Sequence, residues 1–385
     1  MLANRKQVAI VGIGEVPPAR HLPGTTSELA LIAIERAVQD AGLTAGDIDG
    51  IVGEGTSGSL QVLPDVIATL GLSPDTFTAQ GGGAGVGLVG SPLLAQLAID
   101  AGLATTVVCF YAAQFGSESQ SVYEYHAKIP VKAEFEIPHG MFPQPAYMAA
   151  MANRYLYEHG YQPDDLAQVT LSQREWAAKH PEAIKGELLS LDDYHTKPII
   201  AAPLRNVDCS LMNDGAIAFV MTSVERARDL RQRPVRVAGS WRVNEPIGEH
   251  SHLAVREDFL SLPSRFSGPK ALELAQMSVK DIDLFEIYDC FSIIPVLQLE
   301  DLGVFERGEA LAHYRKGEMR PGGSMPVNTH GGLLAHSYLI GGNHMVEAVR
   351  QLRGAAGDRQ VAGAGTALVT GWSSQEHATT ILRAN

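Results

Sequence analysis

The seven residues Asp281-Ile-Asp-Leu-Phe-Glu-Ile287 repeat the pattern of Asp47-Ile-Asp-Gly-Ile-Val-Gly53. In each case a stretch with apolar residues at helical spacing comes first, within residues 25–46 and 268–280, and the seven residues then supply a turn and a strand-like run. The same order of elements at two distant places indicates a chain built from two duplicated halves.

Each half continues with a glycine-rich loop that opens a helix. Gly81-Gly-Gly-Ala-Gly85 precedes a helical stretch at 93–101, and Gly331-Gly332 precedes one at 345–352. The first loop does not directly follow the first strand, as a dinucleotide-binding fingerprint would. We expect it instead to offer backbone N–H donors to an oxyanion. Strand-like runs at 105–110 and 360–370 close the two halves.

Strands that alternate with amphipathic helices predict an α/β fold, with parallel sheets that are covered by helices on both faces. The segment between the halves is rich in proline and carries two helical stretches, so we expect it to form a separate covering region. The predicted division is an N-terminal half at 1–114 plus 205–235, a covering region at 115–204 and a C-terminal half at 236–385.

Composition and charge exclude several classes of protein. The chain has 385 residues, 45% of them apolar and 19% charged, as in an ordinary soluble enzyme. Its formal net charge of -13 argues against binding to nucleic acid or to an anionic membrane. No signal peptide and no run long enough to span a bilayer is present, and three cysteines support neither a disulfide framework nor a metal site. A cytoplasmic location is expected.

Two segments near the C-terminal end carry the chemistry: Glu286-Ile-Tyr-Asp-Cys-Phe-Ser292, and the stretch from Asn328-Thr-His-Gly-Gly332 to Gly341-Gly342. Each resembles a catalytic loop of the thiolase superfamily. Residues 147–183 and 203–223 are similar to the sterol-carrier-protein branch of that family. The resemblance implies a layered α/β/α/β/α sandwich in which the covering region closes an acyl tunnel.

The chain departs from ordinary thiolases at the reactive positions. Thiolases use a cysteine at the start of the first glycine-loop helix and another near the C-terminus, but residues 77–91 contain no cysteine and none follows Cys290. Tyr288 and Tyr338 stand where the resemblance places two histidines. This pattern resembles that of the lipid-transfer-protein aldolases, which cleave steroid side chains.

Other nucleophiles are weaker candidates. Ser91 precedes Pro92 without a nucleophile-elbow motif, so a helix-capping role is expected. Cys109 and Cys209 lie in apolar surroundings typical of buried core thiols. Cys290 also occurs in sterol-carrier-type thiolases, where it is not the nucleophile.

The resemblance and the chemistry together predict a retro-aldolase. A tertiary 3-hydroxyacyl-CoA can cleave once its hydroxyl loses a proton, which requires a base, an acid and an oxyanion hole but no covalent nucleophile. Tyr288 and Tyr338 are predicted to supply the acid and base, with their individual roles left open. The predicted substrate-binding residues are Gly82, Gly83, Asn328, His330, Gly331, Gly332 and His336. His330 either tunes the oxyanion region or caps its loop, and His336 is equally well explained as a structural histidine.

The expected substrate is a branched acyl-CoA. We expect no cofactor other than the CoA that is part of this substrate. Lys128, Lys132 and Arg205 are weak candidates for contacts with its phosphates. By resemblance, the chain is expected to form a homodimer and to join a small OB-fold zinc-ribbon partner protein in a heterotetramer. Two alternatives stay open: an atypical thiolase or acyltransferase, and a non-catalytic subunit that binds acyl-CoA.

Overall fold

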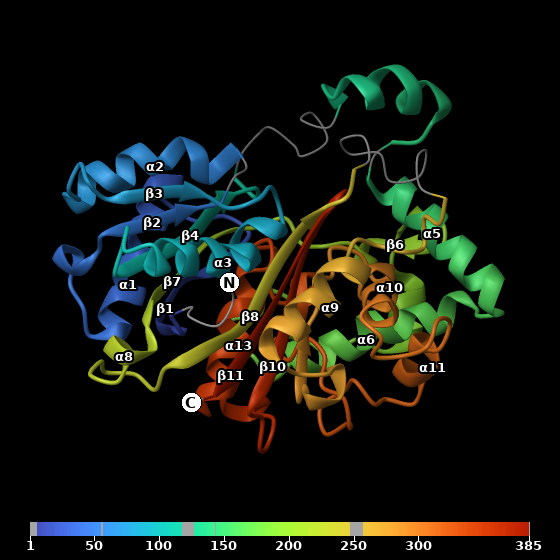
Figure 1. Cartoon of the computed structure of the whole chain (residues 1–385). Helices are drawn as coiled ribbons and strands as arrows, with labels where there is room; N and C mark the ends of the chain where they lie inside the picture. The colour runs from blue at the N-terminus through green and yellow to red at the C-terminus, as the bar shows by residue number, and fades with distance from the viewer. Residues whose placement is uncertain (1–5, 55–56, 118–126, 143, 247–256, 385) are drawn as a thin grey trace.

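A computed structural model describes residues 6–54, 57–117, 127–142, 144–246 and 257–384. The N-terminal half places β1, β2, β3, β4 and β7 side by side, and the C-terminal half does the same with β8, β11, β10 and β9 (Figure 1). The strands of the first half are β1 (Val8–Ala19), β2 (Gly50–Gly53), β3 (Phe77–Gln80), β4 (Thr106–Gln114) and β7 (Asp214–Ser223). Those of the second are β8 (Val235–Asn244), β9 (Leu284–Glu286), β10 (Thr366–Ser373) and β11 (Glu376–Ala384).

The predicted α/β class is confirmed, but the sheets are mixed rather than parallel. β2 runs parallel to β3 and β4, and β9 runs parallel to β10, whereas β7 is antiparallel to both of its neighbours. β11 returns as a hairpin from β10 and accounts for the antiparallel part of the second half. The two halves meet where β1 pairs with β8 through only two residue pairs, Ala9 with Arg236 and Ile10 with Val235.

Two helices, α3 (Val86–Asp100) and α13 (Gly342–Arg353), form the middle layer. Each of them contacts strands of both halves, and one apolar core joins their side chains to those of both sets of strands. α1 (Thr26–Ala41) covers the outer face of the first half and α9 (Ser264–Ala275) that of the second (Figure 1). This arrangement is the layered sandwich that the duplicated sequence predicted.

Local sequence explains where the repeated helices begin and end. Thr25 and Glu28 form a capping box at the start of α1, and Gly42 ends that helix in the left-handed conformation. α3 begins at Val86, earlier than the predicted residue 93, although Pro92 lies inside it. Pro92 has no N–H to give to the Leu88 carbonyl, and the Ser91 hydroxyl donates to that oxygen instead, at 2.7 Å. Ser91 is therefore an internal helix residue and not the predicted cap.

The covering segment lies against the C-terminal half. α5 (Gln144–His159) contacts α10 (Ile293–Asp301), and α6 (Pro163–Ala177) contacts α11 (Ala310–Arg315) and α12 (Gly332–Ala335). The remaining elements include α2 (Ser57–Leu70), α7 (Leu191–Thr196), α8 (Val224–Ala227), β5 (Ile199–Ala201) and β6 (Leu204–Arg205). Within the described ranges, none of the helices combines the length and the apolarity that a bilayer crossing requires.

Candidate active site

Tyr288 and Tyr338 come together although 50 residues separate them in the sequence. Their hydroxyl oxygens lie 3.4 Å apart. Within the described part of the chain each hydroxyl has the other as its hydrogen-bond partner, and no lysine, arginine or histidine donates to either oxygen. The two predicted phenols therefore form a pair with its oxygens directed at one another.

The backbone of each tyrosine is fixed by a buried polar side chain. The Tyr288 N–H donates to Oγ1 of Thr370 on β10 at 2.9 Å, and its carbonyl accepts from the Gln298 amide of α10 at 2.7 Å. The Tyr338 N–H donates to Oδ1 of Asn213 at 2.6 Å. The Tyr288 backbone is thus held by β10 and α10, and the Tyr338 backbone by Asn213, which directly precedes β7. Such support is the preorganisation that positioned acid/base groups require.

Burial keeps both phenols protonated. It raises the pKa of Tyr288 well above its ordinary value, and the neighbouring Tyr338 and Cys290 raise it further. It also raises the pKa of Tyr338, with smaller contributions from the charges of Cys290 and Glu54. At neutral pH the pair consists of two neutral hydroxyl groups that can donate or relay a proton.

Gly85 leaves the space into which the Tyr288 ring fits. A Cβ on Gly85 would lie 2.3 Å from Cε2 of Tyr288 and 2.5 Å from the Trp372 carbonyl oxygen. Gly341 of the second glycine loop lies on the same side, since its Cβ would be 3.4 Å from the Gly85 oxygen. The start of α3, where a thiolase cysteine is expected, is here filled by a phenol from the other half.

Gly85→Ala should therefore damage the site, whereas Gly90→Ala in the same helix should not. The added methyl group at 85 meets a fixed carbonyl and the Tyr288 ring, so we expect a loss of about 1–3 kcal/mol of unfolding free energy together with a fall in turnover. A Cβ on Gly90 meets Ala378 at an ordinary 3.5 Å, so this control should be neutral or slightly stabilising. Urea unfolding and a turnover assay of both variants test the difference, and equal behaviour would contradict the steric argument.

Gly82 and Gly83 lie at a different part of the first loop. A Cβ on Gly82 would meet Arg242 and Glu376, which form an ion pair at 2.9 Å, and the Gly83 N–H approaches the Glu376 carboxylate at 3.4 Å. They do not contact the phenol pair. In the described structure no acceptor bonds to the N–H groups of Ala84 and Gly85, which leaves those two amides available to a ligand oxygen.

The second predicted loop, residues 328–332, is held by contacts with the segment that carries Tyr288. The Asn328 side chain accepts from the Ile287 N–H at 2.6 Å and donates to the Ile287 carbonyl at 2.8 Å, directly before Tyr288. Gly331 packs against Ala177 of α6, and a Cβ on Gly332 would lie 2.2 Å from the Asp289 carboxylate. Asn328, Gly331 and Gly332 thus shape the segment that leads to Tyr338 without touching either phenol.

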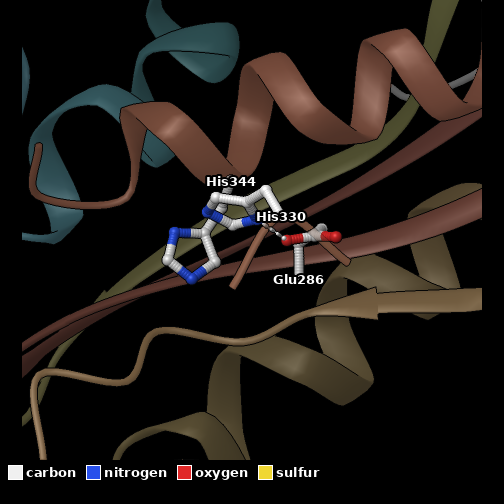
Figure 2. Close-up of side chains that lie close together, drawn as sticks. All are labelled: Glu286, His330 and His344. Carbon is white, nitrogen blue, oxygen red and sulfur yellow. Dashed lines mark ion pairs between the residues drawn. The ribbon is translucent and has the colours of Figure 1, made fainter. Parts of the chain in front are cut away.

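His330 belongs to a buried network behind the tyrosines. Its Nδ1 lies 3.0 Å from Oε2 of Glu286, and the His344 ring packs edge-on to the His330 ring (Figure 2). Ligand atoms of these three residues lie within 4.8 Å of one another, a spacing that invites comparison with a metal centre. Hydrogen bonding assigns them another role.

The amide of Asn343 decides which ring nitrogen of His330 carries the proton. Its Nδ2 lies 3.1 Å from the Ser337 carbonyl oxygen, which only accepts, and 2.9 Å from Nε2 of His330. Nε2 of His330 is therefore the acceptor, and Nδ1 carries a hydrogen that faces Glu286. Nδ1 of His330 and Oε2 of Glu286 lie 3.0 Å apart without an aligned hydrogen bond. A ring nitrogen that carries a hydrogen has no lone pair to give to a metal ion.

Glu286 shares a hydroxyl with a second carboxyl group. The Thr329 Oγ1 lies 2.9 Å from Glu286 and 2.9 Å from Glu347, yet it has one proton to give. Burial raises the pKa of Glu286; burial also opposes the ionisation of Glu347, but its bonds to Arg359 outweigh that effect and lower its pKa. Burial therefore favours the neutral form of Glu286, whereas Arg359 favours the charged form of Glu347.

His336 is also buried, 5.2 Å from His330 and 4.3 Å from His180 between ring centroids. Its Nδ1 lies 2.7 Å from the Ser337 hydroxyl. Burial lowers the pKa of His336, and the neighbouring histidines lower it further. The ring is a neutral, packed side chain, and it does not contact the phenol pair.

The three cysteines are protonated thiols. Burial raises the pKa of Cys109 and that of Cys209 to about 12, and it raises the pKa of Cys290 well above its ordinary value. A thiolate is the reactive form, so these environments oppose nucleophilic attack. The Ser91 hydroxyl also has a partner, since it donates to the Leu88 carbonyl within α3.

Two of the predicted phosphate contacts are engaged elsewhere. Lys132 is fully buried, with its Nζ 4.4 Å from the centre of the Tyr147 ring, and burial lowers its pKa to about 8. Arg205 donates to the Lys197 carbonyl and stacks on Tyr194. Lys128 stays exposed.

Comparisons with known proteins identify the family of this chain. A relative from Mycobacterium tuberculosis, 17-hydroxy-3-oxo-4-pregnene-20-carboxyl-CoA lyase, is 33% identical over 375 residues, covering 94% of this chain and 96% of its own. The chain belongs to the thiolase superfamily, in its sterol-carrier-protein branch. Residues 247–384 match the family model described as thiolase C-terminal domain-like.

Other members of this superfamily support the same placement. A steroid side-chain-cleaving aldolase of Thermomonospora curvata is 30% identical and covers 90% of both chains. The solved Ltp2–ChsH2(DUF35) aldolase superposes with a TM-score of 0.90 at 30% identity over 98% of both chains. Human mitochondrial 3-ketoacyl-CoA thiolase shares the fold, with a TM-score of 0.68 at 14% identity.

Sequence reasoning missed two residues of this thiolase-fold site. Gly85 was not singled out among the glycines of its loop, because its contact with Tyr288 forms only when the two halves pack together. Glu54 follows β2 and is buried, and its charge contributes to the raised pKa of Tyr338. An acidic residue directly after a buried strand and ahead of a glycine loop was the available signal.

Proposed function

We propose that this chain is a carbon–carbon lyase that cleaves a branched 3-hydroxyacyl-CoA with a tertiary alcohol, of the steroid side-chain type. The observation that carries the proposal is the pair of facing phenols, which stand where the thiolase resemblance places two histidines, in a chain whose three thiols are kept protonated by burial. The named substrate of the mycobacterial relative fits this chemistry, because its 17-hydroxyl lies on the carbon β to the thioester carbonyl.

In this reaction the substrate hydroxyl gives up its proton and becomes a ketone as the C2–C3 bond breaks. The electron pair of that bond passes to C2 and forms a thioester enolate, which is then protonated at carbon. The phenol pair contacts the reacting hydroxyl, and the N–H groups of Ala84 and Gly85 at the start of α3 stabilise the enolate oxygen. Because the proton only moves from oxygen to carbon, no cofactor beyond the CoA of the substrate takes part.

We also propose that the chain acts as a homodimer with a small OB-fold zinc-ribbon partner, in a cytoplasmic heterotetramer. The named composition of the Ltp2–ChsH2(DUF35) aldolase supports a second protein. Strand β3 supports a dimer, since it forms an edge of the sheet. The residues Gly82, Gly83, Asn328, His330, Gly331, Gly332 and His336 are proposed to shape the acyl and thioester sites.

The test is direct incubation of the purified chain, alone and with its partner, with 17-hydroxy-3-oxo-4-pregnene-20-carboxyl-CoA. We expect a steroid ketone and a shorter acyl-CoA in equal amounts by mass spectrometry, with no mass added to the protein. An acyl adduct on Cys290 or Ser91 would identify an atypical thiolase instead. Binding without cleavage, with the partner present, would identify a non-catalytic subunit.

A further inference from the structure

Tyr288 lies outside regular secondary structure, and side chains hold its backbone. Residues 287–289 link β9 to α10 and belong to neither element. The Tyr288 N–H donates to the Thr370 hydroxyl, and its carbonyl accepts from the Gln298 amide. If the Gln298 amide were turned over, its oxygen would face the Tyr288 carbonyl and this support would be lost. A group that fixes the orientation of the Gln298 amide therefore also fixes Tyr288.

His377 of β11 is the group that bonds to the other end of this amide. Its Nε2 lies 2.8 Å from Oε1 of Gln298, and its Nδ1 lies 2.6 Å from the Ser267 hydroxyl of α9. The Ser267 oxygen in turn lies 2.9 Å from the Thr379 hydroxyl. All four side chains are fully buried, so bulk water does not compete for these hydrogen bonds.

The Tyr288 carbonyl sets the direction of the bonds in this chain. A carbonyl oxygen only accepts, so Nε2 of Gln298 donates to it and Oε1 of Gln298 accepts. Nε2 of His377 is therefore a donor, and its Nδ1 accepts from the Ser267 hydroxyl. Burial lowers the pKa of His377 to about 3, so at neutral pH the ring has the one donor and one acceptor that the chain requires.

We propose that His377 is a positioning residue for Tyr288 and acts through the amide of Gln298. This inference rests on the proposed function, in which the Tyr288 hydroxyl takes part in proton transfer. The Tyr288 ring lies against Gly85, where an added Cβ would be 2.3 Å from Cε2, and its hydroxyl lies 3.4 Å from that of Tyr338. A small turn of the Tyr288 backbone would disturb both contacts. Misplacement of reacting groups by about 1 Å can cost about 10²-fold in rate.

Three substitutions at His377 separate donation to Gln298 from the packing of the ring. His377→Leu removes both nitrogens, and we expect kcat to fall by about 10- to 100-fold, with KM close to that of the wild type. His377→Gln offers an amide N–H near the position of Nε2 and should recover a large part of the lost kcat. His377→Asn is too short to reach Gln298 and should stay close to His377→Leu. Equal kcat values for His377→Gln and His377→Asn would contradict the inference.

Two serine variants test the outer end of the chain. Ser267→Ala removes the donor to Nδ1 of His377, and it should lower kcat, but less than His377→Leu does. Ser240→Ala is the matched control, because Ser240 is a buried serine of β8 whose hydroxyl lies 2.8 Å from that of Thr380 and, in the described structure, bonds to neither His377 nor Gln298. Its kcat should equal that of the wild type, and an equal loss in both serine variants would count against the proposal.

A double-mutant cycle separates positioning from a general structural role. If His377 acts through Tyr288, His377→Leu should lower kcat in the wild type but not in Tyr288→Phe, which lacks the hydroxyl to be positioned. The same loss in both backgrounds would overturn the inference. If His377→Leu does not fold, His377→Asn takes its place in the cycle.

A crystal structure of the same variant gives a readout that does not depend on turnover. We expect the hydroxyl oxygens of Tyr288 and Tyr338 to lie farther apart than the 3.4 Å of the wild type. An unchanged phenol pair, with the Gln298 amide still on the Tyr288 carbonyl, would overturn the inference. A wild type that cleaves no tertiary 3-hydroxyacyl-CoA would instead overturn the proposed function, and the crystal structure would still test the position of Tyr288.

Discussion

Tyr288→Phe and Tyr338→Phe should each lower kcat by about 10² to 10⁴-fold, because each removes one hydroxyl of a positioned acid/base pair. The phenyl ring keeps the packing of the original side chain, including the contact of Tyr338 with Phe115 at 5.8 Å between ring centroids. We therefore expect thermal unfolding to stay close to that of the wild type. Steady-state assays with the tertiary 3-hydroxyacyl-CoA measure the effect.

Tyr157→Phe serves as the control for the tyrosine variants. Tyr157 is 81% exposed on α5, so the loss of its hydroxyl should not change kcat. Full activity in both Tyr288→Phe and Tyr338→Phe would refute the assignment of the phenol pair. The kcat of the double variant should be only slightly below that of the less active single variant, since the effects of residues that act as one unit are strongly non-additive.

Arg359→Met should destabilise the fold by about 3–5 kcal/mol, because it leaves a buried carboxylate without its partner. Arg359 binds Glu347 at 2.9 and 3.1 Å, and both side chains are almost completely buried. Glu347 also accepts from Thr329, which bonds to Glu286, so its charge is part of the network behind the tyrosines. Urea unfolding at neutral pH measures the loss.

Two further variants show whether the lost stability comes from the unpaired charge. Arg359→Met combined with Glu347→Met removes both charges, and it should recover a large part of the loss. Arg154→Met breaks an exposed pair with Glu158, of which 50% and 30% of the side chains are accessible, and should cost about 0–1 kcal/mol. If Arg359→Met behaved like Arg154→Met, Glu347 would not be a buried charge that depends on Arg359.

The sequence predicted the fold well where its signals are local. Helices and strands of the duplicated halves follow from apolar spacing and from caps such as Thr25 with Glu28. The start of α3 was placed too late because Gly90, Ser91 and Pro92 read as a loop, although Ser91 satisfies the carbonyl that Pro92 leaves free. The antiparallel part of the sheet was missed because it depends on β7 and β11, which pair with β1 and β8 across more than a hundred residues.

The residues of the candidate site also fall into those that the sequence identifies and those that only the folded structure reveals. Tyr288 and Tyr338 are identified by counting along motifs, and the structure brings their hydroxyls together. The role of Gly85 depends on the Tyr288 ring from the other half, which fills the space beside it, and no spacing within one segment encodes that contact. From the sequence, His330 either tunes the oxyanion region or caps its loop, whereas in the structure it accepts from Asn343 and lies beside Glu286, behind the tyrosines.

The seam between the halves carries a consequence for how activity arises. β1 and β8 hold the two halves together through only two residue pairs, so their alignment depends mainly on α3 and α13, which are packed between them. The N-terminal half brings the glycine turn, and the C-terminal half brings both aromatic hydroxyls. A fragment of either half would lack a reaction centre however well it folded, and a slight slip of one half against the other would silence the enzyme before any helix or strand was lost.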